Sequence, residues 1–325
     1  MSAQPSDSDA QWMAAAFREA RKGVGHTRPN PPVGAVIVKD GILLGSGFHA
    51  RAGGPHAEAA AIEDALKNGA EDAIRGSTLY VTLEPCSVPG RVGACTDAIA
   101  RVGISRVVYA AQDPNPANAG KAREALAPHG VAAEQMPRIE GLSGAIDDML
   151  KPFAKHVTTG LPFVTVKIAM SLDGRTHDSG GNAKWISSER ARETTNALRL
   201  EADAIMVGAE TVRKDNPSLL ARPVENPDLL RVVVSRSGNL PREAQVFTDG
   251  KNRTVVFRDA RKAVEELGRM GMMHVLCEGG LKLAAGLAKE GLVDRWLTVL
   301  APIAIGDGPL KEAARIAEAE CLRDW

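Results

Sequence analysis

One stretch, from Gly54 to Cys95, constrains the fold of this chain most, because it holds metal-binding side chains in a definite order. It carries His56 and Glu58 near its start and Cys86 and Cys95 at its end. One imidazole and two thiolates form a zinc-binding set, and three protein ligands leave the fourth tetrahedral position open to water. Bound zinc lowers the pKa of that water to about 7. The stretch therefore predicts a catalytic zinc site rather than a structural one.

The spacing within this stretch assigns different tasks to His56 and Glu58. Two residues apart, they cannot share one helical face, but both can border a metal if His56 lies where the helix begins. We therefore expect Glu58 to carry protons and not to bind the metal. A His-x-Glu followed by Pro-Cys and a second Cys is typical of nucleobase and nucleoside deaminases. The common form has two residues between the cysteines, whereas eight separate Cys86 from Cys95, and their glycines suit a loop that closes over a substrate.

Composition limits the partners and the compartment of this chain. Its 325 residues are enough for about two domains. The 40 basic and 40 acidic residues balance, so net charge favours neither a nucleic acid nor an anionic membrane as a partner. No apolar run approaches the ~20 residues of a membrane span, and the polar start lacks the features of a signal peptide. Four cysteines, two of them in the metal set, do not form a disulfide framework. We expect a cytoplasmic protein with a small-molecule substrate.

Predicted strands and helices alternate through the first half, which indicates an α/β sandwich with a partly parallel sheet. The strand that precedes Cys86 delivers this ligand to its carboxyl end, where open α/β sheets bind ligands. The predicted strands are Val33–Val38, Ile42–Phe48, Ser77–Leu83, Ser105–Ala111 and a short one at Val131. The predicted helices are Ala10–Lys22, His56–Asn68, Cys95–Arg101, Lys121–Pro128 and Arg138–His156.

A linker over 158–162 leads to a second α/β unit, so we expect domains at 1–157 and 158–325. Its predicted strands are Phe163–Ala169, Ala204–Val207, Arg231–Val234, Thr254–Phe257, Met273–Cys277 and Arg295–Leu300, and its predicted helices are Ser188–Leu200, Lys282–Lys289 and Lys311–Cys321. No G-x-G-x-x-G or P-loop motif occurs. Gly279 and Gly280 join a strand to a helix. This turn either offers backbone N–H groups to an anion or needs glycine for a positive φ.

Short motifs lie on both sides of the linker: Pro29–Pro31, Val36–Gly41, Gly54–Glu58, Thr82–Ser87 and Asp113–Pro116 before it, and Lys167–Arg175, Trp185–Ile186, Thr211–Val212, Asp215–Pro217 and Glu278–Gly280 after it. Together they resemble the bifunctional riboflavin-biosynthesis family, from about Trp12 to Gly308. In that family a diaminohydroxyphosphoribosylaminopyrimidine deaminase is fused to a 5-amino-6-(5-phosphoribosylamino)uracil reductase. The eight residues between the cysteines match as well.

The resemblance implies a cytidine-deaminase-like α/β/α sandwich followed by a dihydrofolate-reductase-like α/β domain. It also implies two cofactors, zinc and NADPH. The first domain would deaminate 2,5-diamino-6-(ribosylamino)pyrimidinone 5′-phosphate by attack of hydroxide on the ring carbon that bears the amine. The second would transfer hydride from NADPH and convert the ribosyl group into a ribityl side chain.

Site residues carry over by matching the motifs. His56, Cys86 and Cys95 would hold zinc, Glu58 would move protons, and Asn30 would contact the substrate. We also expect Arg91 to neutralise the substrate phosphate, since the loop between the cysteines carries no other charge. In the second half the implied nicotinamide-dinucleotide residues are Ala169, Trp185, Thr211, Asp215, Gly280, Leu281, Lys282, Leu283, Ala284, Ala285 and Gly286. The implied substrate residues there are Lys167, Arg199, Leu219, Arg222 and Glu278.

Three departures from the family pattern bear on these expectations. Val88 stands where the family usually has a histidine, and residues 92–94 replace its Thr-Pro-Pro. Ala183 replaces a serine, and Ser235-Arg236 replaces Asp-Ser, so that Arg236 either meets the cofactor's 2′-phosphate or lies on the surface. The chain also ends at Trp325, where the family usually adds a strand.

Two other functions stay open from the sequence. One is a nucleoside or tRNA deaminase with a non-catalytic second domain for binding or oligomerisation, which the zero net charge disfavours. The other is a degenerate reductase that serves only as an oligomerisation scaffold. The strand that the family usually adds at the end would be missing, which we expect to leave an uncovered sheet edge in the second domain and so to favour a homo-oligomer.

Overall fold

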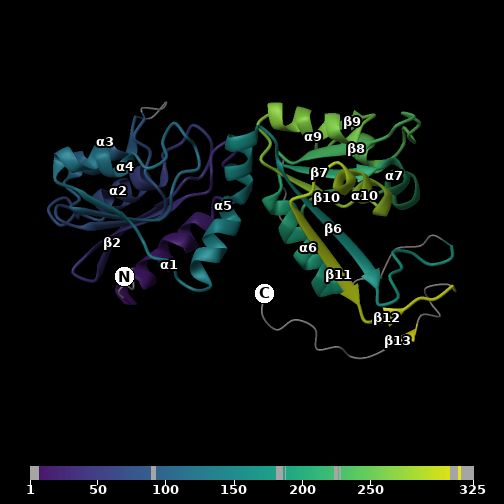
Figure 1. Cartoon of the computed structure of the whole chain (residues 1–325), viewed down its shortest axis with the longest axis horizontal. Helices are drawn as coiled ribbons and strands as arrows, with labels where there is room; N and C mark the ends of the chain where they lie inside the picture. Colours follow the sequence, from purple (N-terminus) through teal and green to yellow (C-terminus); the bar gives the residue numbers. More distant parts are fainter. Residues whose placement is uncertain are drawn as a thin grey trace. The chain divides into compact units, whose positions relative to one another are not determined.

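The computed structural model describes residues 7–88, 93–180, 186, 188–222, 226, 228–307 and 314–315. The chain forms two compact units, Met1–Gly160 and Leu161–Trp325, and each is described by itself (Figure 1). The domain limit expected between residues 157 and 158 falls in the last turn of helix α5 (Leu142–Thr159). No helix in the described ranges has both the length and the apolar composition of a membrane span.

The first unit is built on a five-stranded mixed sheet with the order β2-β1-β3-β4-β5. Its strands are β1 (Gly34–Lys39), β2 (Ile42–Phe48), β3 (Thr78–Leu83), β4 (Arg106–Ala111) and β5 (Ala132–Gln135). Strand β1 runs antiparallel to both β2 and β3, whereas β3, β4 and β5 are parallel. The helices are α1 (Asp7–Arg21), α2 (Ala57–Lys67), α3 (Cys95–Val102), α4 (Ala122–Leu126) and α5, with a 3₁₀ turn η1 (Ala127–His129) after α4.

Two glycines show how helices cover both faces of this sheet. A Cβ on Gly34 would lie 2.2 Å from the carbonyl oxygen of Ala16 in α1, and one on Gly47 would lie 2.3 Å from the amide nitrogen of Ala61 in α2. Gly47 pairs with Ala35, the residue next to Gly34. Because successive residues of a strand face opposite sides, α1 and α2 cover opposite faces. The result is the α/β/α sandwich that the sequence predicts.

The second unit contains a six-stranded, fully parallel sheet with the order β11-β6-β10-β7-β8-β9. Its strands are β6 (Phe163–Ser171), β7 (Ala204–Gly208), β8 (Leu230–Val234), β9 (Thr254–Phe257), β10 (His274–Cys277) and β11 (Arg295–Ala301). The helices are α6 (Glu189–Glu201), α7 (Ala209–Asp215), α8 (Gln245–Thr248), α9 (Ala260–Arg269) and α10 (Leu281–Lys289). A separate two-stranded ribbon pairs β12 (Ile303–Ala304) with β13 (Ala314–Arg315).

Alternating side chains of this sheet fill two separate cores. On one face Met206 and Val275 join buried residues of α9 and α10. On the other face Ile205 and Leu276 join Val212 of α7 and neighbouring loop residues. Buried on both faces, these strands read as continuous apolar runs, which is typical of parallel sheets.

The predicted fold class is confirmed, and all six strands of the large second sheet lie within a residue or two of their predicted bounds. Helices α7, α8 and α9 were not predicted. The helix expected over 311–321 is wrong at Ala314–Arg315, which form β13. The rest of that segment lies outside the described residues.

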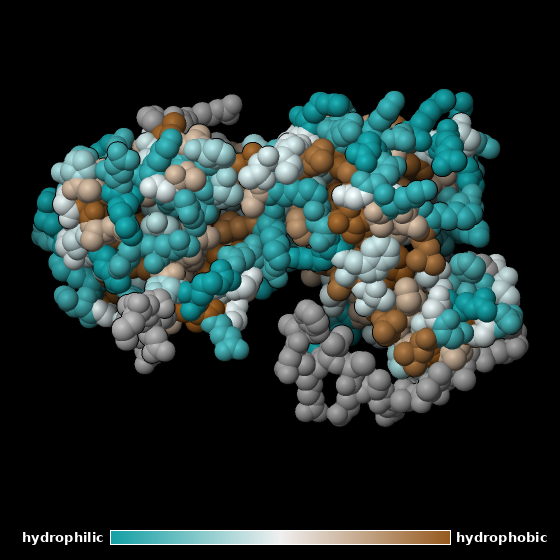
Figure 2. Space-filling view, viewed as in Figure 1, coloured by the Kyte–Doolittle hydropathy of each residue, from teal (hydrophilic) through white to brown (hydrophobic). Residues whose placement is uncertain are grey.

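Strand β11 is the outer strand of the described sheet, and its side chains alternate between covered and exposed. Trp296 and Leu300 are 45% and 55% exposed. Figure 2 shows hydrophobic surface in the lower part of the second unit, where Figure 1 places β11 and the end of β6. An apolar outer strand of this kind is a surface on which another chain can pair.

Candidate functional site

The structure brings His56, Cys86 and Cys95 together at one end of the first sheet. Their ligand atoms all lie within 4.8 Å of one another. His56 Nδ1 is 3.2 Å from Cys95 Sγ and 3.6 Å from Cys86 Sγ, and the two sulfurs are 3.3 Å apart. Tetrahedral zinc with ordinary bond lengths places two thiolates about 3.8 Å apart and a thiolate about 3.6 Å from an imidazole nitrogen. The three side chains therefore fit zinc with shifts of a few tenths of an ångström.

Element ends position each of these side chains. His56 is the N-cap of α2, with an extended backbone, and Cys95 is the first residue of α3. Cys86 follows the end of β3, and its carbonyl accepts a hydrogen bond from the N–H of Thr96 at 3.2 Å. The positive ends of two helices thus point at the cluster and favour thiolate over thiol. Hydrogen bonding from Cys95 and His56 further lowers the pKa of the Cys86 thiol.

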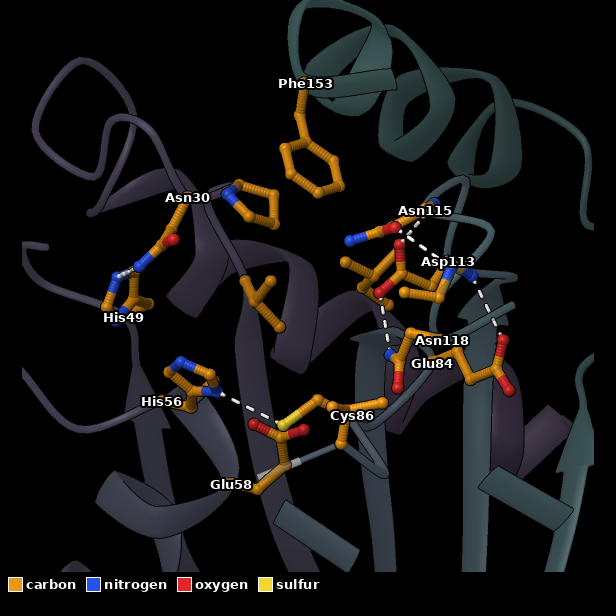
Figure 3. A pocket seen from close by; sticks show the side chains of 16 residues that line it. Asn30, His49, His56, Glu58, Glu84, Cys86, Asp113, Asn115, Asn118 and Phe153 are labelled. Atoms are coloured by element: carbon orange, nitrogen blue, oxygen red, sulfur yellow. Dashed lines mark hydrogen bonds between the residues drawn. The ribbon is translucent and has the colours of Figure 1, made fainter. Parts of the chain in front are cut away.

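Glu58 lies in the first turn of α2 and is 4% exposed. Figure 3 shows its carboxylate beside Cys86, on the floor of the pocket. Burial, assisted by the nearby Cys86 thiolate, raises the pKa of Glu58 to about 7. A bound metal cation would act in the opposite direction. A carboxyl group with a pKa near the working pH is suited to accept and return a proton.

A cavity of about 280 Å³ lies above this cluster, within the first unit (Figure 3). Its walls come from the loop before β1, the end of β2, the loops after β3 and β4, and α5. The lining residues are Asn30, Pro31, Val33, His49, His56, Ala57, Glu58, Leu83, Glu84, Cys86, Val88, Asp113, Asn115, Ala117, Asn118 and Phe153. The predicted substrate residue Asn30 is therefore in the same pocket as the metal cluster. Arg91 lies outside the described residues.

Glu84 organises the wall of the pocket that follows β4. Its buried carboxylate accepts hydrogen bonds from the backbone N–H groups of Asp113 (3.1 Å), Gly120 (2.9 Å) and Ala122 (3.0 Å). The Asp113 carboxylate in turn accepts from Asn118 Nδ2 at 2.8 Å. Asn118 Oδ1 then accepts from the Ser87 amide at 2.7 Å, directly after Cys86. These bonds connect the loop after β4, which lines the pocket, to the loop after β3, which carries Cys86.

Four residues line the pocket although no site role was predicted for them: Glu84, His49, Asn118 and Phe153. The acidic residue beside Pro85-Cys86 was a usable signal for Glu84, because a carboxylate between a strand and a metal ligand needs hydrogen-bond donors. No local pattern marks the others. They meet the site only through the folded positions of β2, the loop after β4 and α5.

In the second unit the predicted substrate residues Lys167, Arg199 and Glu278 lie close together, within β6, within α6 and directly after β10. Arg199 Nε and Nη2 donate to the two Glu278 oxygens at 2.6 and 2.9 Å, and Arg199 Nη1 donates to the carbonyl of Leu220 at 3.0 Å. Burial lowers the pKa of Lys167, although the nearby Glu278 carboxylate opposes this. A bidentate pair of this kind fixes both side chains. This pairing of Arg199 with Glu278 was not predicted from the sequence.

The other two predicted substrate residues of this unit follow α7. Leu219 is buried and has a positive φ of 52°, and exposed Arg222 donates to Ser218 Oγ at 3.1 Å. Neither is linked to Lys167 by a hydrogen bond that the structure records.

The predicted nicotinamide residues lie on three elements at the carboxyl end of this sheet. Ala169 is in β6, Thr211 and Asp215 are in α7, and Gly280 is the N-cap of α10, followed by Leu281 to Gly286 within that helix. Trp185 lies outside the described residues. Gly280 has a φ of −61°, and Gly279 does not have a positive φ either, so the alternative that this turn needs glycine for a positive φ is wrong. A Cβ on Gly280 would meet nothing within 4 Å, so the described residues do not cover the backbone closely at the start of α10.

Comparisons with known proteins agree with this two-part organisation. Residues 6–111 match the family "cytidine and deoxycytidylate deaminase zinc-binding region", and residues 162–314 match the "RibD C-terminal domain". The fold and the metal cluster thus define a zinc deaminase joined to a reductase, with zinc and NADPH as the cofactors. The chain belongs to the family of the riboflavin biosynthesis protein RibD.

The relatives cover nearly all of the chain. RibD of Aquifex aeolicus is 35% identical over 92% of this chain and 88% of its own, and RibD of Corynebacterium ammoniagenes is 39% identical over 92% and 89%. A crystal structure of a diaminohydroxyphosphoribosylaminopyrimidine deaminase/5-amino-6-(5-phosphoribosylamino)uracil reductase from Thermotoga maritima matches with a TM-score of 0.84, 35% identity, and 93% of this chain and 89% of that one covered. Acinetobacter baumannii RibD gives a TM-score of 0.78 at 32% identity, with 97% and 93% covered. These findings favour a bifunctional enzyme of riboflavin biosynthesis over a nucleoside or tRNA deaminase with a non-catalytic second domain.

Proposed function

We propose that the pocket of the first unit deaminates 2,5-diamino-6-(ribosylamino)pyrimidinone 5′-phosphate. The observation that carries this proposal is the buried Glu58 carboxyl group beside the His56, Cys86 and Cys95 cluster, on the floor of a cavity of about 280 Å³. These three side chains would hold zinc, which supplies an activated water when bound. Asn30 would bind the ring edge, and Arg91 would meet the phosphate.

Glu58 is the group that moves protons in this proposal. It takes a proton from the attacking water and returns it to the substrate, so that the amine leaves as ammonia. Its position at the start of α2 keeps the carboxyl group next to the reacting carbon. The apolar side chains of Leu83, Val88 and Phe153 line the same cavity and limit access of other water molecules.

The experiment that tests this proposal is release of ammonia from the diaminopyrimidinone phosphate by wild type and Glu58→Gln. We expect the variant to keep its zinc and its fold and to lose ~10²- to 10⁴-fold in rate. Glu63→Gln, which changes an exposed glutamate on the same helix, is the matched control and should be unaffected. A wild type without activity on this substrate, or a fully active Glu58→Gln, contradicts the assignment.

We propose that the second unit reduces the deaminated product with NADPH. Ala169, Trp185, Thr211, Asp215 and the Gly280–Gly286 segment would bind the cofactor. Lys167, Arg199, Leu219, Arg222 and Glu278 would bind the substrate, with the Arg199–Glu278 pair holding both charged groups in place. The Arg199 guanidinium donates to Glu278 and to the Leu220 carbonyl, so we assign Arg199 to positioning the ribosyl group of the substrate rather than to binding its phosphate.

We further propose that the protein works in the cytoplasm as a homo-oligomer that binds neither nucleic acid nor membrane. Two metal-ligating thiols 3.3 Å apart need a reducing compartment to stay available to zinc. Balanced charge removes the electrostatic attraction to polyanions. The apolar β11 strand, with Trp296 and Leu300 exposed, supports association through the second unit.

A further inference from the structure

His49 connects Asn30, which lines the pocket, to the loop that carries the predicted metal ligand His56. It follows β2, is 2% exposed, and is anchored by its own N–H, which donates to the Val33 carbonyl at 2.9 Å. Its Nδ1 atom is 2.8 Å from the carbonyl oxygen of Pro55, the residue before His56. Its Nε2 atom is 3.0 Å from Nδ2 of Asn30.

These two distances determine which ring nitrogen carries the proton. A carbonyl oxygen can only accept a hydrogen bond, so Nδ1 must be the N–H that donates to Pro55. The ring is buried, and its recorded partners are Asn30, Pro55 and the edge-on ring of His56, none of which is a carboxylate that would stabilise a second proton. In a neutral imidazole with Nδ1 protonated, Nε2 is an acceptor.

An acceptor at Nε2 in turn sets the orientation of the Asn30 carboxamide. The amide nitrogen must face His49 and donate, because an amide oxygen there would oppose a lone pair. Figure 3 shows the consequence: the Asn30 nitrogen points at His49, and its oxygen points into the cavity. The structure records no donor to that oxygen among the residues it describes. Asn30 therefore offers the substrate an acceptor.

We propose that His49 is a positioning residue, which holds the Asn30 carboxamide with its oxygen toward the substrate so that Asn30 accepts a hydrogen bond from an N–H beside the attacked carbon. This inference rests on the proposed deamination. The pyrimidinone has two such donors, the ring N–H and the amine that leaves. Without His49 the carboxamide turns freely and can present its NH₂ group, which opposes either donor.

The test is a double-mutant cycle on ammonia release with His49→Phe, Asn30→Leu and the double variant. Since the bond is made to bound substrate, we expect His49→Phe to raise KM roughly three- to tenfold, with kcat and zinc content little changed. If His49 acts through Asn30, the double variant is no worse than Asn30→Leu alone. Additive effects of the two substitutions would overturn the proposal. His49→Gln, whose carboxamide can both donate and accept, should restore most of the loss.

A second measurement needs neither variant nor substrate. In ¹⁵N NMR spectra of the wild-type chain, we expect His49 to show a protonated Nδ1 and an unprotonated Nε2. A proton on Nε2 would sink the proposal even if the enzyme is active. Conversely, a wild type that shows this tautomer but releases no ammonia would refute the proposed reaction and leave the orientation of Asn30 intact.

Binding of the deaminated product identifies which donor Asn30 meets. The product keeps the ring N–H and has lost the amine. If Asn30→Leu weakens product binding as much as it raises KM, the ring N–H is the donor. If product binding is unchanged, the donor is the amine. Tighter product binding in Asn30→Leu with an unchanged KM would contradict the acceptor role.

Discussion

Glu58 and His274 are both buried and ionisable, but one has a proposed catalytic role and the other a structural role. Burial raises the pKa of Glu58 to about 7 and lowers the pKa of His274 to about 4, because a buried site favours the neutral form of either group. Glu58 lines a cavity. The His274 ring instead contacts Thr165 Oγ1 at 2.9 Å and the Glu201 carbonyl at 3.4 Å, between β6 and the end of α6. His274 is therefore a structural residue.

The lowered pKa of His274 predicts that the second unit loses stability in acid. Between about pH 6.5 and 4 the unfolded chain binds a proton on His274 that the folded chain excludes, so the free energy of unfolding decreases as pH falls through this window. From pH 7 to pH 5 the loss should be about 2 kcal/mol. Urea unfolding of wild type and His274→Gln at both pH values measures it. An equal loss in the variant would contradict this origin.

Arg91 carries the second prediction at this scale. It supplies the charge in the segment between the cysteines, and a hydrogen bond between charged groups contributes about 1.5–3 kcal/mol. Arg91→Ala should therefore raise KM for the phosphorylated pyrimidine by roughly 10- to 150-fold. Arg101→Ala, at the far end of α3, is the control and should leave KM unchanged. An unchanged KM in Arg91→Ala would place the phosphate elsewhere.

Among the elements, the loop between β4 and α4 depends most on a single side chain. The Glu84 carboxylate accepts hydrogen bonds from two backbone N–H groups of this loop, those of Asp113 and Gly120, and from the N–H of Ala122, the first residue of α4. In Glu84→Gln one oxygen becomes an NH₂ group that faces those donors, so at least one buried N–H is left unsatisfied, at a cost of about 1–3 kcal/mol. We expect lower stability in urea and a raised KM, since the loop lines the pocket. Glu124→Gln, at an exposed position of α4, should change neither stability nor KM. Wild-type stability in Glu84→Gln would show that the loop is held by other contacts.

Elements of this fold differ in how well the sequence alone predicts them. The parallel strands were predictable because runs such as Arg231–Val234 are apolar and bounded by turn residues. Helix α9 was not predicted, although Asp259 caps it, with its carboxylate accepting from the Lys262 N–H at 2.9 Å, and although Ala260, Ala263, Val264 and Leu267 recur at helical spacing. The sequence signal for this helix was therefore present. Helix α7 is short and follows β7 without a turn signal.

The residues of the two candidate sites also differ in how well the sequence alone predicts them. Zinc chemistry demands particular residue types, so His56, Cys86 and Cys95 could be read from the sequence, and the structure brings them together. His49 and Asn118 act through hydrogen bonds that exist only once distant segments meet. The Arg199–Glu278 pair joins residues 79 positions apart. No local pattern encodes a partner at that separation.

For the whole molecule, each site cluster consists of residues from one unit alone, which predicts independent activities. Glu58→Gln should abolish ammonia release and still oxidise NADPH when given the deaminated intermediate. Glu278→Ala should release ammonia normally but lose NADPH oxidation, because it leaves Arg199 without its partner carboxylate. Glu278→Gln is the matched variant that keeps the shape of the side chain. Both activities are measured on the same zinc-loaded protein. Loss of both activities in Glu58→Gln would show that the sites are coupled.

The exposed face of β11 leads to the last prediction, that the chain forms a homodimer or larger assembly through its second unit. Trp296 and Leu300 leave apolar surface on an outer strand. Light scattering at micromolar concentration should give at least twice the mass of one chain, and Leu300→Lys should lower it. Val88→Lys, an equally apolar exposed position in the first unit, is the control. A monomeric wild type would refute the prediction.

The end of helix α5 determines where the gene should be truncated to encode the deaminase unit without the reductase unit. Phe153 of this helix lines the pocket, and Gly160 ends the helix in a left-handed conformation with its N–H on the His156 carbonyl. A stop codon after residue 157 would remove that C-cap and the final turn, and fraying would reach toward the pocket wall. A stop codon after Gly160 keeps both. A deaminase gene that ends after Gly160 therefore encodes a complete helix α5 beside the pocket, whereas one that is three residues shorter does not.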